Sequence, residues 1–294
     1  MARHSDIPRV DFRPPEGYAL DIEVFPANDW LNRVPEDHFR YPSRLDFHQL
    51  ILVTQGQFGH TVDFQLQSMP TGSLLTMRPG QVQCFEANPP WDGWVVIFRP
   101  ESVQSPVEVG SLLLGLSIDD LPVQLVLEKA SFEPVRQAMA QMHQDAKLTG
   151  PMPLVGALER AQLQALLMRL QIASEQLQAQ SAIDSSLAKH FRKFRHATEQ
   201  RFHEWHQISA YTQALGISEK TLSRATQEAT GLSAKAYLSK RIALEAKRML
   251  AYTRWPIAQV ADKLGFDEAS NFIKFFRREA GLAPSEFKKQ HRGA

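Results

Sequence analysis

Apolar and polar residues follow a period of two in the first third of the chain and a helical period in most of the rest. Within residues 60–67, Val62, Phe64 and Leu66 alternate with polar neighbours, which is typical of a half-buried antiparallel strand. Further strands are predicted, between Gly- and Pro-containing turns, over residues 47–55, 73–77, 82–85 and 94–98. Short strands with such regular turns indicate a sandwich or a small barrel.

The middle of the chain predicts two helices. Ser131 is placed to cap the first, which would run with Pro134 in its first turn toward Asp145. The second carries an apolar stripe at steps of three and four residues, made by Leu163, Leu166, Leu167, Leu170, Ala173 and Leu177. Such a stripe fits a helix that packs on its own barrel and equally one that pairs with its twin in a homodimer, and the pattern leaves both readings open.

The last third contains an internal repeat. Residues 215–218 (LGIS) recur 49 residues later as residues 264–267 (LGFD), and each copy lies between a short helical segment and a second one. A Gly at the turn, a Ser or Asp that caps the second helix and a Gly that ends it are typical of a helix-turn-helix. The units are expected at about 207–229 and 257–280. A linking helix capped by Ser233 and running through Thr253 would span about 30 Å, close to one turn of B-DNA.

Charge divides the chain at the same place. The formal net charge is only +1, which by itself would argue against a polyanion-binding protein. However, residues 1–186 hold 13 Lys and Arg against 22 Asp and Glu, whereas residues 187–294 hold 20 against 10. The polar stretch just before the change of sign is the expected linker. The totals therefore indicate an acidic module joined to a basic one.

Several classes of function receive no support from the sequence. Cys84 is the single cysteine, which excludes an intrachain disulfide framework. His203 and His206 are three residues apart, not the four that a helical zinc motif requires, and no phosphate-binding, dinucleotide or nucleophile-elbow motif occurs. No apolar signal segment and no run of 18 apolar residues is present, so a cytoplasmic protein with no membrane partner is expected.

Two segments carry a resemblance to a known family. Residues 71–83, TGSLLTMRPGQVQ, resemble the second half of a cupin barrel, as found in the sensory domain of AraC-type regulators. The C-terminal stretches IAQVADKLGF (257–266), SNFIKFFRR (270–278) and GLAPSEFK (281–288) closely match the AraC/XylS signature I-x-x-V-A-x-x-L-G-F, S-x-F-x-R-x-F-K-R and G-x-x-P-x-x-F/Y-R. The chain is therefore identified as a member of the AraC/XylS family of transcriptional regulators.

The resemblance implies an α+β multidomain fold. A cupin-like, effector-sensing β-barrel is expected over residues 1–110, a helical dimerisation segment over 111–180 and a linker over 181–187. An all-α, homeodomain-like domain with two helix-turn-helix units is expected over 188–294.

The resemblance also implies which residues contact DNA. In the first unit these are Lys220, Thr221, Ser223 and Arg224, and in the second Ala269, Ser270, Asn271, Lys274 and Arg277. Arg224 is suited to a guanine edge and Asn271 to adenine, whereas the lysines offer sequence-independent attraction to phosphate. The first unit departs from the pattern at Thr212, where the family has a small Ala, and has Thr226 where the second unit has Phe276, which predicts thinner packing in the first unit.

The barrel itself is expected to bind a small molecule, with His48, Gln83, Phe85 and Trp94 as candidate lining residues. A metal-binding cupin needs several His and a carboxylate that converge on one ion, but Gln83 stands where the second motif has its His and Val53 where a carboxylate is needed. No metal and no cofactor are therefore expected.

These observations predict a DNA-binding regulator, not an enzyme. We expect a ligand-responsive activator of a catabolic operon, with an aromatic acid among the conceivable effectors. Its expected partners are double-stranded DNA, a small-molecule effector, RNA polymerase and a second copy of the chain through residues 151–180. The alternatives are a cupin-type enzyme fused to a DNA-binding module and an architectural DNA protein with a silent barrel.

Overall fold

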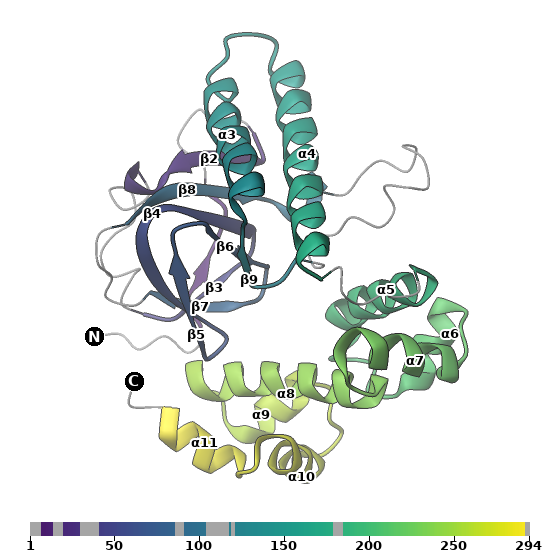
Figure 1. Ribbon diagram of the computed structural model, residues 1–294. Coiled ribbons are helices and arrows are strands. Elements are labelled where there is room, and N and C mark those ends of the chain that lie inside the picture. The colour runs from purple at the N-terminus through teal and green to yellow at the C-terminus, as the bar shows by residue number, and fades with distance from the viewer. Residues whose placement is uncertain are drawn as a thin grey trace. The chain divides into compact units, whose positions relative to one another are not determined.

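A computed structural model describes residues 7–13, 20–29, 41–85, 91–103, 118, 121–178 and 185–291. The chain forms two compact units, one within Pro8–Gln180 and the other within Ser181–Ala294. The first combines a curled sheet with two long helices, and the second is entirely helical (Figure 1). Residues 181–184 of the expected linker lie outside the described residues.

The sheet of the first unit contains nine described strands. They are β1 (Arg9–Val10), β2 (Ile22–Pro26), β3 (Ser43–Leu45), β4 (His48–Val62), β5 (Gln65–Pro70), β6 (Ser73–Met77), β7 (Val82–Phe85), β8 (Trp91–Phe98) and β9 (Gln124–Val126), with a short 3-10 helix at Pro100–Val103 after β8. Their order is β1-β3-β7-β4-β6-β9, with β8 bridging β4 to β2 and β5 beside β4. The sheet thus includes β9, which lies beyond residue 110, the predicted end of the barrel domain.

Strand β4 organises the sheet because its two halves pair with different neighbours. Its first half lies between β6 and β8, and its second half lies between β5 and β7. A register shift between Val53 and Gln55 separates the halves, and Gly56 adopts a left-handed conformation with φ of +77°. Such a bulge bends a strand and increases its twist, which lets one strand cross from one side of a curled sheet to the other.

The hairpin between β4 and β5 differs from the prediction. The sequence placed one strand over residues 60–67, but the chain turns at Asp63 and Phe64, which have φ of 49° and 70°. Asp63 stabilises this turn through Oδ1, which accepts a bond from the backbone N of Val82 at 3.1 Å, and through Oδ2, which accepts from Gln81 Nε2 at 3.0 Å. These partners are distant in sequence, so local propensity did not reveal the turn.

The two faces of the sheet bury separate hydrophobic clusters. The interior cluster fills the curl of the sheet and contains Phe25, Leu45, Ile51, Val53, Phe58, Val62, Met69, Leu75, Met77, Trp91 and Val95, among others. The helix-facing cluster contains Val24, Leu50, Leu52, Leu74, Val96 and Phe98, together with residues of the two helices. Both are almost fully buried.

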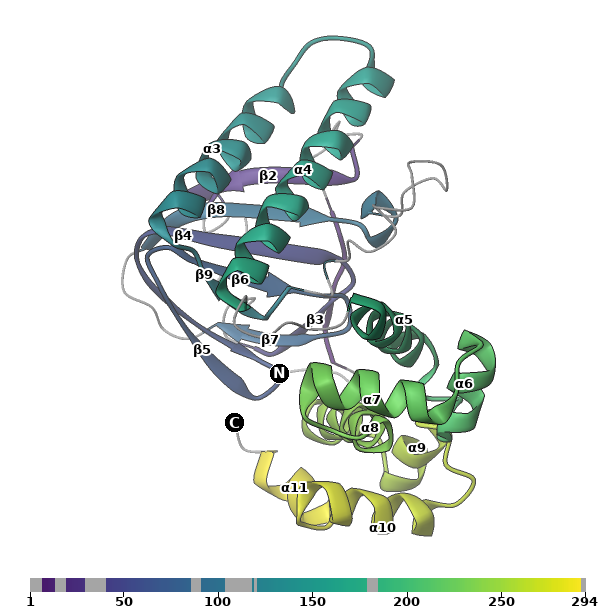
Figure 2. The same cartoon turned by 45° about the vertical axis from the view of Figure 1, so that its right-hand side comes forward.

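Helices α3 (Lys129–Asp145) and α4 (Met152–Gln178) form a hairpin over the sheet (Figures 1 and 2). α3 begins two residues before the predicted cap Ser131, and its N-cap is Glu128. The predicted apolar stripe of α4 lies in the helix-facing cluster from Leu163 to Ala173, whereas Leu177 is 49% exposed. The stripe therefore packs on the sheet of its own chain and is not a free dimerisation face.

The second unit consists of seven helices among its described residues. They are α5 (Ser185–Arg201), α6 (Ile208–Leu215), α7 (Glu219–Thr230), α8 (Ala234–Tyr252), α9 (Ile257–Lys263), α10 (Ala269–Ala280) and α11 (Pro284–His291). α8 packs against α7, α9, α10 and α11 (Figure 1). α6 with α7 and α9 with α10 are the two helix-turn-helix units, which begin and end within one residue of the sequence-based bounds. α5 begins three residues before the predicted start at residue 188.

No helix among the described residues is long and apolar enough to span a membrane.

Candidate nucleic-acid interface and sensor site

The first recognition helix, α7, is fixed at both ends by local chemistry. Ser218 caps it by accepting a hydrogen bond from the backbone N of Thr221 at 3.1 Å. Gly231 ends it in a left-handed conformation with φ of +70°. Leu222, Ala225 and Thr226 face the core. The capped helix therefore presents one fixed face to solvent.

That face carries three of the four predicted contact residues. Lys220, Ser223 and Arg224 are exposed. Thr221 is half-buried, and its hydroxyl lies 2.9 Å from the hydroxyl of Ser218. Because the Thr221 hydroxyl is already engaged at the helix start, we assign it to the cap and place base and phosphate contact on the other three.

The second recognition helix, α10, has the same division of faces. Phe272 and Phe276 are fully buried, whereas Asn271, Lys274 and Arg277 are exposed. Its start differs from the prediction, because the N-cap is Glu268 and not Asp267, and the Glu268 side chain accepts no capping bond from a backbone N–H of the first turn.

Two other predicted contact residues lie at the start of α10. Ala269 is half-buried, and the exposed Ser270 hydroxyl donates to Glu268 Oε2 at 2.9 Å. Ile273, which the sequence reasoning did not single out, is 38% exposed on this helix. An apolar side chain on this face is suited to the methyl group of thymine.

The cationic side chains on these faces are available for a polyanion. Lys220, Arg224, Lys274 and Arg277 form no ion pair with any described residue. Arg278, by contrast, contacts Glu279 at 2.9 Å and lies over the Phe275 ring. The exposed cations of the two recognition helices thus form a set distinct from those engaged within the protein, as phosphate and base-edge contact requires.

Helix α8 sets the separation of the two units. Its 19 residues span about 28 Å, close to the distance between successive major grooves on one side of B-DNA. Ser233 caps it, as the sequence predicted, by accepting from the backbone N of Ala236 at 3.2 Å. A buried ion pair between Arg248 and Glu245 lies within this helix at 2.8 Å.

The first helix-turn-helix unit packs on an aromatic core that the sequence did not predict. Thr226 is smaller than its counterpart Phe276, and its buried hydroxyl donates to the carbonyl of Leu222. Helix α5 contributes Phe194, which is fully buried and packs edge-on against Tyr211 at 5.3 Å between ring centroids. α5 packs against α7 and thus adds a buried aromatic side chain to the core around the first helix-turn-helix unit.

The four predicted effector residues of the sensor unit do not lie together. His48 stacks on Phe98 at 5.1 Å, and Trp94 packs against the helix-facing cluster. Gln83 and Phe85 lie with the interior cluster instead. The expectation that all four line one lumen is wrong. For His48 the reason is the bulge in β4, because one extra residue exchanges the faces on either side of it.

His60 is the residue that the sequence reasoning missed. His48 and His60 are separated by an even number of residues in β4, so simple alternation would place both on one face. The bulge between them exchanges the faces, and His60 points into the interior, where it is 0% exposed. Its Nε2 donates to Gln83 Oε1 at 3.0 Å, and burial lowers the pKa of His60 to about 3. His60 Nδ1 has no hydrogen-bond partner among the described residues, a deficit that costs about 1–3 kcal/mol.

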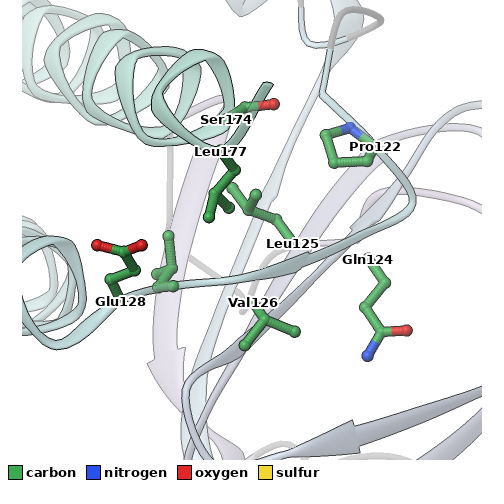
Figure 3. A pocket seen from close by; sticks show the side chains of 8 residues that line it. Pro122, Gln124, Leu125, Val126, Glu128, Ser174 and Leu177 are labelled. Carbon is green, nitrogen blue, oxygen red and sulfur yellow. The ribbon is translucent and has the colours of Figure 1, made fainter. Parts of the chain in front are cut away.

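A groove of about 400 Å³ lies between β9 and the end of α4 (Figure 3). It is lined by Pro122, Gln124, Leu125, Val126, Leu127, Glu128, Ser174 and Leu177. None of the four predicted effector residues lines it. Leu125 belongs to the helix-facing cluster, so the groove and His60 lie on opposite faces of the sheet.

The described residues contain no group of three or more His, Cys, Asp or Glu side chains that could hold a metal ion. His203, one of the two histidines whose spacing excluded a helical zinc motif, contacts Glu204 at 3.3 Å.

Comparison with known proteins covers both units. Residues 31–170 match the family model described as an AraC-like ligand binding domain, and residues 211–290 match one described as a helix-turn-helix domain. The chain is similar to the HTH-type transcriptional activator RhaS of Shigella dysenteriae, with 24% identity over 98% of each chain. RhaS of Escherichia coli strain SE11 is 24% identical over 97% of each chain. These relatives are named as regulators of transcription and not as enzymes.

Similar solved structures include ToxT of Vibrio cholerae bound to an unsaturated fatty acid. It is 10% identical, with 93% of this chain and 96% of that chain covered and a TM-score of 0.38. The DNA-binding domain of AdpA in complex with a target DNA is 24% identical, with 36% of this chain and 93% of that chain covered and a TM-score of 0.32.

Proposed function

The chain belongs to the AraC family of DNA-binding transcriptional regulators, and from this premise we propose that it activates a catabolic operon when a small molecule binds its N-terminal unit. The DNA-binding unit engages two successive major grooves, with α7 in one and α10 in the other. The observation that carries this proposal is the set of unpaired cations on the exposed faces of two recognition helices that one 19-residue helix separates.

Within each groove the exposed side chains have different tasks. Arg224 takes a guanine edge through two parallel hydrogen bonds, and Asn271 pairs with adenine. Lys220, Lys274 and Arg277 contact phosphate and fix the position of the helices on the duplex. Ser223 and Ser270 supply short polar contacts beside them.

The effector acts by shifting an equilibrium between two arrangements of the chain. A ligand that binds one arrangement more tightly increases its population, and the DNA-binding units then engage the promoter and RNA polymerase differently. We place this activity in the cytoplasm, where promoter DNA and metabolites meet.

A second copy of the chain completes the regulator in this proposal. Because the stripe from Leu163 to Ala173 is buried against its own sheet, the contact between copies must use the outer face of α4. Leu154, Leu158 and Ile172 are 67%, 38% and 56% exposed on this helix. Sedimentation of the wild type and of an I172E variant tests this assignment. A dimer that the variant weakens supports it, and a dimer of unchanged stability contradicts it.

Footprinting on the DNA upstream of the chain's own coding region tests the proposed function. We expect protection of two adjacent half-sites, with a change in position or strength when a catabolic metabolite is added. Protection that never changes with any small molecule would favour a DNA-binding protein with a silent sensor unit instead.

A further inference from the structure

Two arginines stand side by side at one edge of the sheet in the sensor unit. Strand β1 pairs with β3 in parallel, and the register places Arg9 opposite Arg44 and Val10 opposite Leu45. A backbone bond fixes this pairing, because Arg44 N donates to the carbonyl of Pro8 at 2.8 Å. Neighbouring strands lie about 4.8 Å apart, so the two guanidinium groups are within reach of one common ligand.

Both arginines face away from the interior of the curled sheet. Leu45 belongs to the interior cluster, and Val10 packs against that cluster. Successive side chains of a strand point to opposite faces, so Arg9 and Arg44 lie on the outer face. Arg9 is exposed and Arg44 is half-buried. A ligand bound by this pair therefore lies outside the sheet, on the side opposite to the interior cluster.

A pocket of about 230 Å³ lies at this pair of arginines and is lined by Arg9, Arg44, Leu45, Asp46 and Gly80. Gly80 has a left-handed conformation with φ of +83°, and its backbone N donates to the carbonyl of Leu45 at 2.8 Å. Asp46 is held through Oδ1, which accepts from the backbone N of Phe12 at 3.0 Å. The charged atoms at the pocket are thus two guanidinium groups and one anchored carboxylate.

This pocket is locally basic within an acidic unit. Residues 1–186 hold 13 Lys and Arg against 22 Asp and Glu, yet two of these cations occupy facing positions on neighbouring strands. Like charges at such positions repel each other, and an anion between them removes the repulsion. Arg13, in the same segment as Arg9, contacts Asp11 at 3.1 Å instead. Arg9 forms no ion pair with any described residue, so its guanidinium is available to a ligand.

The number of donors at the pocket favours phosphate over carboxylate. One guanidinium fork already matches both oxygens of a carboxylate. Two forks match the three terminal oxygens of a phosphate monoester, which carries a charge of about −1.5 to −2 at neutral pH. Asp46 would repel a second anionic group but accepts a hydrogen bond from a hydroxyl. The ligand that fits these groups carries one phosphate and at least one hydroxyl.

We propose that this pocket is a second small-molecule site of the sensor unit, which binds a phosphorylated polyol or sugar. Arg9 and Arg44 bind the phosphate group, and Asp46 accepts a hydrogen bond from a hydroxyl of the same molecule. The site goes beyond the proposed function, because it is independent of the molecule that controls DNA binding. The phosphate joins β1 to β3, so the bound ligand stabilises their pairing and raises Tm by mass action.

The test is a calorimetric titration of the full chain in a chloride buffer of low ionic strength. The probes share one skeleton and are glycerol 3-phosphate, glycerate and glycerol, with inorganic phosphate as a fourth. We expect glycerol 3-phosphate to bind most tightly, inorganic phosphate to bind more weakly, and glycerate and glycerol to give no measurable binding. Glycerate that binds as tightly as glycerol 3-phosphate, or no binding of either phosphate compound, would overturn the proposal.

Two matched variants assign this binding to the pocket. Arg9→Gln removes one guanidinium fork from an exposed position, so glycerol 3-phosphate should bind about tenfold more weakly. Arg13→Gln makes the same change four residues along the chain, where the side chain is 82% exposed and contacts Asp11, and should leave binding unchanged. Equal affinity of wild type and Arg9→Gln, or an equal loss with Arg13→Gln, would contradict the assignment.

A third variant tests the role of Asp46. Asp46→Asn retains an oxygen that accepts from Phe12 N but loses the negative charge and the second acceptor. Inorganic phosphate should bind this variant more tightly than wild type, and the preference for glycerol 3-phosphate over inorganic phosphate should decrease. A preference that is the same in Asp46→Asn and in wild type would contradict the contact between Asp46 and a hydroxyl.

A measurement on the wild type alone covers the case in which Arg9→Gln does not fold. In the full chain labelled with ¹⁵N at arginine, glycerol 3-phosphate should shift two Nε–Hε resonances together in one saturable step. Inorganic phosphate should shift the same two resonances at higher concentration. Shifts that spread evenly over all arginines, or no shift of any arginine, would overturn the proposal.

Discussion

His206 Nε2 lies 2.8 Å from the carbonyl oxygen of Leu264, which joins the segment before the first helix-turn-helix unit to the turn of the second. The His206 ring also contacts Phe266 at 4.7 Å. The two helix-turn-helix units are thus connected at a point outside α8. This second connection restrains their relative orientation, as simultaneous reading of two grooves requires.

A second close approach at this turn distinguishes two glycines that the sequence presented as equivalent. Gly216 and Gly265 both adopt left-handed conformations, with φ of +64° and +76°. A Cβ on Gly216 would meet nothing within 4 Å, but a Cβ on Gly265 would lie 2.0 Å from the carbonyl oxygen of His203. The second turn therefore needs glycine for space as well as for backbone conformation.

Replacing each glycine with alanine should separate these two effects. G216A should lower the free energy of unfolding by roughly 1–2 kcal/mol, the cost of a left-handed alanine. G265A should cost clearly more, because the clash is with backbone and the packing around His203 must open. Urea denaturation of the two variants measures the difference. Equal costs would show that the close approach at His203 does not hold in solution.

Removing the reading side chains should weaken specific DNA binding by predictable amounts. R224A and N271A should each cost about 1–3 kcal/mol on the preferred sequence and relax the choice of base at one position. K274A should weaken binding to all sequences alike and reduce the salt slope by about 1. Titrations at several salt concentrations measure both quantities. R278A is the control, because Arg278 already contacts Glu279. A loss with R278A as large as with R224A would contradict the assignment of faces.

The buried His60 should make the stability of the sensor unit depend on pH. Burial lowers the pKa of His60 to about 3 in the folded chain, below its ordinary value of 6.5. The unfolded chain therefore binds a proton that the folded chain does not. The His60 contribution is complete above about pH 6.5 and falls by up to about 1.4 kcal/mol per pH unit as the pH decreases toward 3.

Unfolding free energies at pH 7 and pH 5 for wild type and His60→Phe measure this contribution. The variant should lose less stability than wild type over this interval. His196→Phe, a change at an exposed residue of α5, should behave as wild type. An identical pH dependence in wild type and His60→Phe would show that His60 is not the buried group described here.

The ion pair inside α8 should matter more than its counterpart at the surface. Glu245 and Arg248 have side chains that are each 3% exposed, whereas Arg278 beside Glu279 is 64% exposed. E245A should destabilise the chain by about 3–5 kcal/mol because it removes the carboxylate beside a buried guanidinium. E279A should cost less than about 1 kcal/mol. Thermal unfolding compares the two, and similar losses would contradict the burial of the α8 pair.

The helical unit was largely readable from the sequence because its signals are local. The repeated Leu-Gly turn, the cap at Ser218 and the stop at Gly231 all act within a few residues of the helices that they define. The contact between His206 and Leu264 was not readable, because 58 residues separate the two positions and no motif links them. Local sequence signals thus predicted the two helix-turn-helix units but not the contact that joins them.

The sensor unit was harder to predict because its key features depend on pairing between distant strands. The turn at Asp63 is held by residues of β7, and the bulge after Val53 reverses which parity of β4 faces inward. Simple alternation therefore placed His48 inside and overlooked His60. Trp94 was also expected in the lumen, but on β8 it lies on the same side as Val96 and Phe98 and packs on the helix-facing cluster.

Selection of bound sequences from a random DNA library by the full chain tests the central claim most directly. We predict enrichment of two half-sites whose centres lie about 10 base pairs apart, one contacted by α7 and the other by α10. R224A should lose enrichment in one half-site and N271A in the other. A single enriched half-site that both variants affect alike, or no enrichment at all, would contradict the account.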